Sequence, residues 1–214
     1  MMGPYLYVAL KEAHPDVEIL AAQIVDGSSS YASYLVTRDD RGITRVEQLR
    51  GKRIDFVDRQ STSGYLFPRA YFARLGIEPG TFFSQVVFSG DHMSALELVL
   101  ARKVDAAATF GTALHLAAQK LPQGKHLRIL AKTGRPPLDA AVACAGLDRA
   151  FVARLRETLL GLSTRTEEGR RALRGPFPIN GFIAARDDNF AEVRRVAAVV
   201  ANADRRASAA ANKP

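Results

Sequence analysis

The chain has 214 residues, 47% of them hydrophobic, and its 30 Lys and Arg residues outnumber its 22 Asp and Glu residues to give a formal net charge of +8. This length admits one or two domains, no run of about 18 apolar residues predicts a transmembrane helix, and the single Cys144 excludes an intramolecular disulfide. The basic residues are dispersed among acidic ones and no nucleic-acid-binding motif occurs, so the charge predicts a solvated surface rather than a nucleic-acid interface.

Strand-like runs alternate with amphipathic helical runs from Tyr34 onward. In chain order the prediction is a strand at 33–39, a short helix at 43–51, a strand at 52–57, a helix at 65–76, a strand at 83–88, a helix at 93–103, a strand at 104–110, a helix at 112–120, a strand at 126–132, and helices near 148–163 and 189–203. This alternation predicts an α/β fold with a mostly parallel sheet that helices cover on both faces.

Three hydroxyl side chains and a glycine stand where the strand at 52–57 runs into the helix at 65–76. They are Ser61, Thr62, Ser63 and Gly64, within VDRQSTSGYLFP. In open α/β sheets, ligands bind where strands end and helix N-termini present unpaired N–H groups. Proline is tolerated near the first turn of a helix, so Pro68 places the predicted N-cap at Ser63 or Gly64. A single serine would suggest a plain helix cap, whereas this cluster favours an oxyanion site.

The next strand–helix junction has the same form. VVFSGDHMSAL places Ser89, Gly90, Asp91 and His92 between a strand and a helix. We expect His92 in the first helical turn, at the same carboxyl edge of the sheet as the hydroxyl cluster. Alone, it would suggest a surface histidine beside an aspartate; two such junctions on successive units favour a binding site.

The sequence gives little support to an enzyme. The nucleophile elbow of hydrolases would need glycines where Ser61 and Tyr65 stand. Ser63, His92 and Asp139 also differ in chain order from the hydrolase triad. There is no Walker P-loop or HExxH motif, and no histidine or cysteine has the spacing of zinc ligands. We therefore predict neither catalysis nor a metal or cofactor.

Three motifs resemble one known family. They are GKRIDFVDRQSTSGYLFP (51–68), VVFSGDH (86–92) and KVDAAA (103–108), and the segments GPYLYV, YASYLVTRDD and EEGRRAL…INGF agree with them. Together they resemble the phosphate/phosphite/phosphonate-binding proteins of ABC transporters, which are type II periplasmic binding proteins. The resemblance covers essentially the whole chain.

The resemblance implies a two-lobe α/β fold, with parallel or mixed sheets flanked by helices, whose lobes close on the ligand. It places residues 38–134 in lobe two, and residues 1–37 and 135–214 in lobe one. The family pattern begins with a secretion signal and a βαβ unit of lobe one, and the sequence starts after them, so we expect this first unit to be missing. Such a loss would leave a sheet edge unpaired and favour self-association.

The resemblance also implies the ligand-binding residues. Those that match the family positions are Ser61, Thr62, Ser63 and His92 for the oxyanion, Tyr31 before the first crossover, and Asp139 in the second. Tyr34 is a weaker match than Tyr31, and an ordinary loop carboxylate is the alternative for Asp139. Aminophosphonate binders carry a carboxylate after VDAAA, whereas this chain reads TFGTALHL at 109–116, without an acid.

The predicted function is therefore that of a periplasmic or extracytoplasmic membrane-associated protein that binds phosphonate, phosphite or phosphate-like oxyanions for an ABC-type importer. Its expected partners are the anion and the cognate permease, and no nucleic acid. Two alternatives stay open: an oxyanion-sensing domain of a signalling system and, with less support, an enzyme on the same scaffold.

Overall fold

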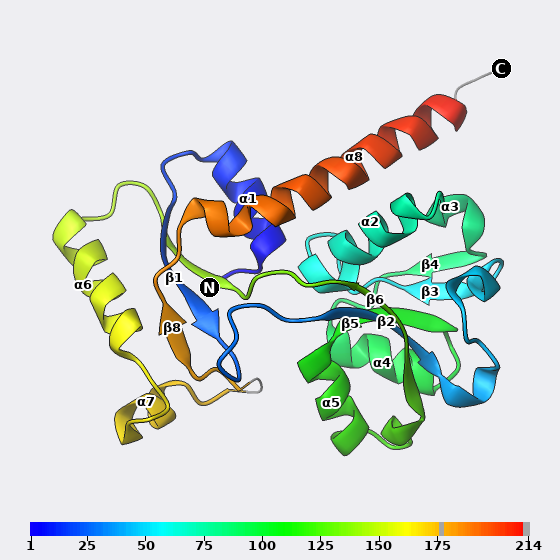
Figure 1. Cartoon of the computed structure of the whole chain (residues 1–214), viewed down its shortest axis with the longest axis horizontal. Coiled ribbons are helices and arrows are strands. Elements are labelled where there is room, and N and C mark those ends of the chain that lie inside the picture. The colour runs from blue at the N-terminus through cyan, green and yellow to red at the C-terminus, as the bar shows by residue number, and fades with distance from the viewer. Residues whose placement is uncertain (176–177, 212–214) are drawn as a thin grey trace. The chain divides into compact units, whose positions relative to one another are not determined.

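The computed structural model describes residues 1–175 and 178–211 (Figure 1). Contacts between residues divide the chain into two compact units. Unit 1 comprises residues 1–31 and 136–194, and unit 2 comprises residues 32–135 together with the chain from residue 195. These units differ from the predicted lobes at residues 32–37, at Arg135 and in the chain from residue 195, all of which group with unit 2. The division into lobes remains a prediction.

Unit 1 is built on a small antiparallel sheet. Its elements are α1 (Pro4–Ala13), β1 (Glu18–Ile24), β7 (Ala140–Ala143), α6 (Arg149–Gly161), α7 (Glu167–Ala172) and β8 (Gly181–Ile183). The strand order is β7-β1-β8, and both pairings of β1 are antiparallel. Val152 of α6 packs with Leu20, Ala141 and Ala143 of the sheet in a buried cluster. The prediction of a mostly parallel sheet is wrong for this unit, because local periodicity does not fix how distant segments pair.

Unit 2 is built on a five-stranded sheet. Its elements are β2 (Ser33–Arg38), β3 (Arg53–Asp55), α2 (Phe67–Arg74), α3 (Pro79–Phe82), β4 (Gln85–Val87), α4 (His92–Leu100), β5 (Ala106–Phe110), α5 (Gly111–Lys120) and β6 (Leu127–Gly134). The strand order is β4-β3-β5-β2-β6, and β2 runs antiparallel to both of its neighbours. Two of its four pairings, β3 with β4 and β3 with β5, are parallel and the other two are antiparallel, so the sheet is mixed and the prediction of a mostly parallel sheet holds for half of it.

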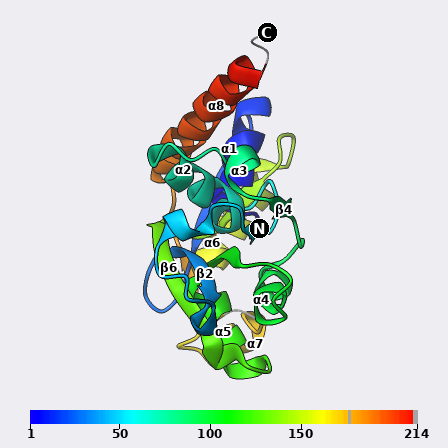
Figure 2. The same ribbon diagram turned by 90° about the vertical axis from the view of Figure 1, so that its right-hand side faces the viewer.

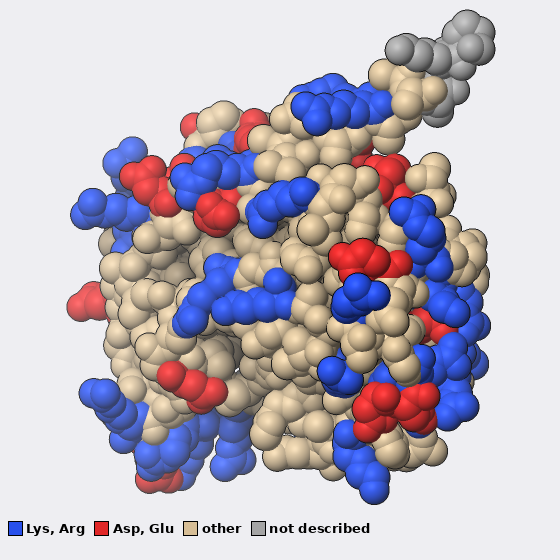
Figure 3. Space-filling model, turned by 45° about the vertical axis from the view of Figure 1, so that its right-hand side comes forward, with Lys and Arg blue, Asp and Glu red and all other residues tan. Residues whose placement is uncertain are grey.

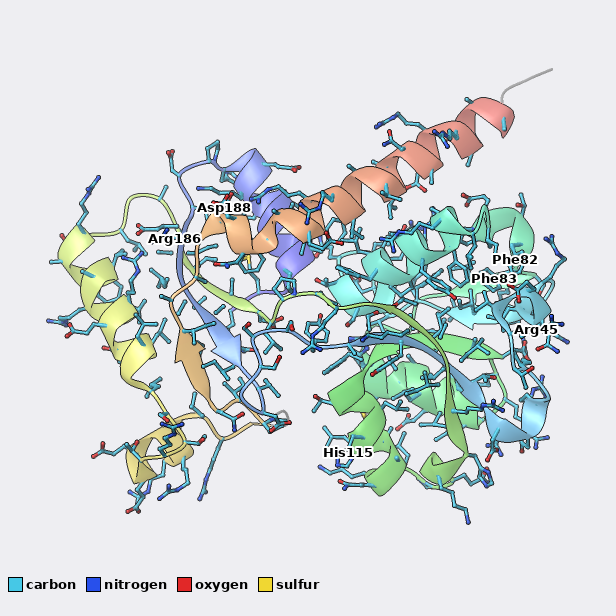
Figure 4. All side chains as sticks on the ribbon, viewed as in Figure 1. Arg45, Phe82, Phe83, His115, Arg186 and Asp188 are labelled. Atoms are coloured by element: carbon cyan, nitrogen blue, oxygen red, sulfur yellow. The ribbon has the colours of Figure 1, made fainter. Side chains whose placement is uncertain are left out.

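Helices cover both faces of this sheet, with α2 on one side and α4 and α5 on the other (Figure 2). Ile54 and Phe56 pack with Phe72 of α2 in the larger hydrophobic core. Phe82 and Phe83 close the end of that core, with ring centroids 5.0 Å apart (Figure 4). Because side chains alternate along a strand, Asp55 lies on the opposite face from Ile54 and Phe56.

Several predicted elements differ in extent. The short helix expected at 43–51 is a 3₁₀ turn at Val46–Leu49, and α1 and β1 precede the first element that was predicted. The last helix, α8 (Ala191–Ala211), continues beyond the predicted end near residue 203. Within unit 2 it is tied to α2 by an ion pair between Asp204 and the buried Arg69. No helix in the described ranges is long and apolar enough to cross a membrane.

Candidate functional site

The hydroxyl loop forms a helix cap and a wide first turn. Ser61 is the N-cap, because its Oγ accepts a hydrogen bond from Gly64 N at 2.9 Å while its backbone is extended. Leu66 N donates to Ser61 O at 3.0 Å, which closes a π-helical turn over Thr62–Leu66 that continues into α2. The predicted N-cap at Ser63 or Gly64 is therefore wrong. Such turns are frequent at functional sites because they displace side chains from regular helical positions.

Two hydroxyls of this turn lie against the sheet. Thr62 and Ser63 are 4% and 2% exposed. The Ser63 carbonyl accepts a hydrogen bond from Ser33 Oγ at 3.0 Å, and Ser33 is itself hydrogen-bonded to Thr133 at 2.6 Å. The Ser63 hydroxyl makes no hydrogen bond with another described residue. Of the three predicted hydroxyls, Ser61 is thus occupied as a cap and Ser63 has a free donor.

One residue joins this loop to the next. Val57 N donates to Gly64 O at 3.1 Å, and Val57 O accepts from Gly90 N at 2.8 Å. The two strand–helix junctions are therefore adjacent and share the backbone of a single residue. Gly64 permits this approach, since a Cβ at position 64 would lie 2.5 Å from Val57 Cβ.

The second junction presents His92 at the start of α4, as predicted. Asp91 is the N-cap, and its carboxylate accepts hydrogen bonds from Met93 N and Ser94 N, both at 2.9 Å. His92 Nδ1 lies 3.2 Å from Thr109 Oγ1, and the ring stacks edge-on against Phe110.

The surroundings of the His92 ring determine its protonation state. Burial lowers the pKa of His92 to about 4, so the ring is neutral at pH 7. The tautomer whose Nδ1 accepts the Thr109 hydroxyl carries its proton on Nε2. In that tautomer the junction offers a neutral N–H donor beside the N-terminus of a helix.

A buried carboxyl in the same region was missed from the sequence. Asp55 ends β3 and is 0% exposed, and its Oδ1 accepts a hydrogen bond from Ser89 Oγ at 2.8 Å. The available signal was an aspartate between Ile54 and Phe56 in a strand, where an apolar residue is expected. No three His, Cys, Asp or Glu side chains gather as metal ligands would within residues 1–175 and 178–211.

The other two predicted site residues belong to unit 1. Tyr31 precedes β2, and its backbone N donates to Pro136 O at 3.0 Å. Asp139 immediately precedes β7, and burial raises the pKa of its carboxyl. Ser61, Thr62, Ser63 and His92 lie on two adjacent junctions of unit 2. The contribution of these four residues to ligand binding, like that of Tyr31 and Asp139, stays a prediction.

We expect His92→Ala to weaken oxyanion binding about tenfold, as the loss of one hydrogen bond to a charged group would. The melting temperature should change little, because His92 is only partly buried at the start of a helix. Calorimetry with methylphosphonate and thermal unfolding measure the two effects. His115→Ala is the matched control, since His115 is an exposed residue of α5 (Figure 4). A large drop in melting temperature with intact binding would show that His92 is structural.

Comparisons with known proteins identify the family. The sequence model of the family described as "ABC transporter, phosphonate, periplasmic substrate-binding protein" matches residues 1–190. A curated relative, the phosphate-import protein PhnD of Mycolicibacterium smegmatis, is 30% identical over 119 residues, which are 51% of this chain and 37% of the relative. The matched part thus spans little more than a third of that relative's length.

Two solved structures share the fold. A binding protein component of an ABC phosphonate transporter from Pseudomonas aeruginosa has a TM-score of 0.81 at 23% identity, covering 95% of this chain and 68% of that one. PhnD1 from Prochlorococcus marinus, in complex with methylphosphonate, has a TM-score of 0.80 at 21% identity, covering 91% and 75% of the two chains. The fold class is therefore that of a type II periplasmic binding protein. With the family match extending over residues 1–190, the chain belongs to the periplasmic substrate-binding proteins of phosphonate ABC transporters.

Proposed function

We propose that the chain binds a phosphonate, phosphite or phosphate-like oxyanion as the substrate-binding component of an ABC importer. The observation that carries the proposal is the pair of strand–helix junctions joined through Val57. One presents the Ser63 hydroxyl and the other presents neutral His92 at the start of α4. No bond of the ligand is broken in this function, which consists of capture and release.

Neutral donors suit such a role. Hydroxyl and imidazole N–H groups donate to anionic oxygens without adding a full positive charge, and the N-terminus of α4 adds a partial one. The site therefore favours an oxyanion and still allows its release. The relatives support the class of ligand: one is named for phosphate import and another was solved with methylphosphonate. Both ligands present a phosphorus oxyanion.

The family supports a proposal for the partner and the location. A substrate-binding protein of this family delivers its ligand to the permease of its own transporter, so we propose that permease as the protein partner. The site of action is then the periplasm or the outer side of the cytoplasmic membrane. The basic side chains on the face shown in Figure 3 do not contradict this role, since they form separate groups with acidic side chains between them.

We expect Thr62→Val and Ser63→Ala each to weaken oxyanion binding by about 1–3 kcal/mol, the usual contribution of a hydrogen bond to a charged group. Titration calorimetry of the purified protein with methylphosphonate and with inorganic phosphate measures this loss and tests the proposed function. Ser84→Ala is the control, because Ser84 is an exposed serine of unit 2. Unchanged affinity in both site variants would make this loop a plain helix cap, and no binding by the unmodified protein would overturn the function.

The residue after the VDAAA motif is not acidic, and this should determine which ligands bind. That residue is Thr109, which is fully buried and hydrogen-bonded to His92. A buried ammonium group without a counter-charge costs several kcal/mol. We therefore expect phosphate, phosphite or a small alkylphosphonate to bind more tightly than 2-aminoethylphosphonate in a competition titration. Tighter binding of the aminophosphonate would show that Asp139 or another acid supplies the charge.

A further inference from the structure

Asp55 is a buried acid that the proposed function does not use. It is 0% exposed at the carboxyl end of β3, where its paired neighbours are Val87 of β4 and Ala107 of β5. Its Oδ1 accepts the Ser89 hydroxyl at 2.8 Å, whereas its buried Oδ2 has no hydrogen-bond partner among the described residues. A charged oxygen in this state is costly, because burial removes water and nothing replaces it.

The carboxyl is connected to the loop that presents His92. Ser89 Oγ lies 2.8 Å from Asp55 Oδ1 and 3.2 Å from the carbonyl oxygen of Asp91. Asp91 in turn caps α4, and His92 is the next residue. The single hydroxyl proton of Ser89 is shared between these two acceptors, so Ser89 lies between the buried end of β3 and the cap of the helix whose first residue is expected to contact the anion.

The electrostatic surroundings of Asp55 are simple. Burial raises the pKa of Asp55 to about 6, the Ser89 hydrogen bond lowers it, and the nearby Asp91 carboxylate raises it again. Val87 and Ala107 add no charge from the neighbouring strands, and His92 on α4 is neutral above about pH 4. No cation among the described residues compensates the Asp55 carboxylate. An anion at the neighbouring loops would add to the negative charge around it.

We propose that Asp55 is a proton-linked positioning residue of the oxyanion site: through Ser89 it fixes the loop that carries His92, and it takes up a proton when the anion binds. This inference rests on the proposed function. Neutralising Asp55 removes repulsion between two negative charges in a poorly solvated region, which changes affinity on the order of tenfold. Anion affinity should therefore rise as the pH falls from 8 to 5.

The test compares wild type with Asp55→Asn at pH 5 and pH 8, by titration calorimetry with methylphosphonate and with inorganic phosphate. Asparagine keeps an acceptor for Ser89 and imitates the protonated acid. The titration of the ligand and of His92 is common to both proteins, so it cancels in their ratio. We expect the ratio of wild-type to Asp55→Asn Kd to be near one at pH 5 and to reach about ten at pH 8. Asp188→Asn removes an exposed carboxylate of unit 1 and should give a ratio that does not change with pH.

Two further measurements test the connection through Ser89 and keep the proposal testable if Asp55→Asn fails to fold. Ser89→Ala should lower affinity several-fold at both pH values, because the loop loses its anchor. In the wild-type protein, the buffer dependence of the binding heat gives the number of protons taken up, and the protein's share should be largest near pH 6.

Each outcome decides the matter. Three results would each overturn the role of Asp55 without affecting the proposed anion site. They are a Kd ratio that is equal at pH 5 and pH 8, no proton uptake by the protein near pH 6, and unchanged affinity in Ser89→Ala. Absence of binding to both ligands at every pH would overturn the proposed function itself, and the inference with it.

Discussion

Replacing Gly64 by alanine is expected to lower the free energy of unfolding by about 3 kcal/mol and to weaken oxyanion binding severely. The added methyl group would lie 2.5 Å from Val57 Cβ and 2.8 Å from Ser61 Oγ, so both neighbours must move. Val57 holds the two loops through its backbone, and a shift of Val57 therefore disturbs both sets of anion donors. Chemical denaturation measures the first effect, and calorimetry with methylphosphonate measures the second.

The control for this change is Gly161→Ala at the end of α6. No atom lies within 4 Å of a Cβ built at that position, so alanine fits without displacement. A helical glycine replaced by alanine should leave the protein equally stable or slightly more stable. If Gly64→Ala behaved in the same way as Gly161→Ala, the close contact with Val57 would not constrain the site.

Asp105→Ala is expected to lower the free energy of unfolding by roughly 2–3 kcal/mol at neutral pH. The Asp105 carboxylate is buried and accepts hydrogen bonds from Arg53 N at 3.0 Å, from Arg53 Nε at 3.2 Å and from Arg41. Both arginine side chains reach water, so the loss stays below that expected when a buried charge is stranded. The variant also leaves the N–H of Arg53, the first residue of β3, without this acceptor.

The dependence of this effect on pH has a definite sign. Burial raises the pKa of Asp105, but hydrogen bonds from Arg53 and Arg41 outweigh it and hold the pKa below its ordinary value. The stabilisation is therefore complete above the unfolded-state pKa of about 3.9 and disappears as the pH falls through the lower folded-state value. The difference between wild type and Asp105→Ala should shrink below about pH 4. Asp188→Ala, which removes an exposed carboxylate (Figure 4), should change stability little at any pH. A difference that persists unchanged at pH 3 would contradict this account.

The two strand–helix junctions were predictable because their signals are local. Hydroxyl residues and glycine at both junctions, with Pro68 after the first, placed the two loops between the correct strands and helices, and their role in anion binding stays a prediction. The cap was misplaced because a regular helix was assumed to contain Pro68; the wider turn over Thr62–Leu66 lets the helical path begin at Ser61 and still brings Pro68 into the first turn of α2.

Other features of the site depend on contacts between distant segments. The hydrogen bond of His92 with Thr109 and the position of Asp55 beside Ser89 both require the order of β4, β3 and β5 in the sheet. Hydrophobic periodicity predicts that these strands form, but it does not predict which strands pair with one another in the sheet. The antiparallel sheet of unit 1 was beyond prediction for the same reason, since β1 pairs with strands more than 100 residues away along the chain.

The position of Val57 has a consequence for local opening of the fold. The N–H of Val57 donates a hydrogen bond to Gly64 O in the first loop, and its carbonyl oxygen accepts one from Gly90 N in the second loop. A fluctuation that lifts either loop from the end of β3 must strain the other, so the two should open as one cooperative segment. The amide hydrogens of Val57 and Gly90 would then exchange with deuterium at similar rates. A bound anion that contacts only one loop would slow exchange in both.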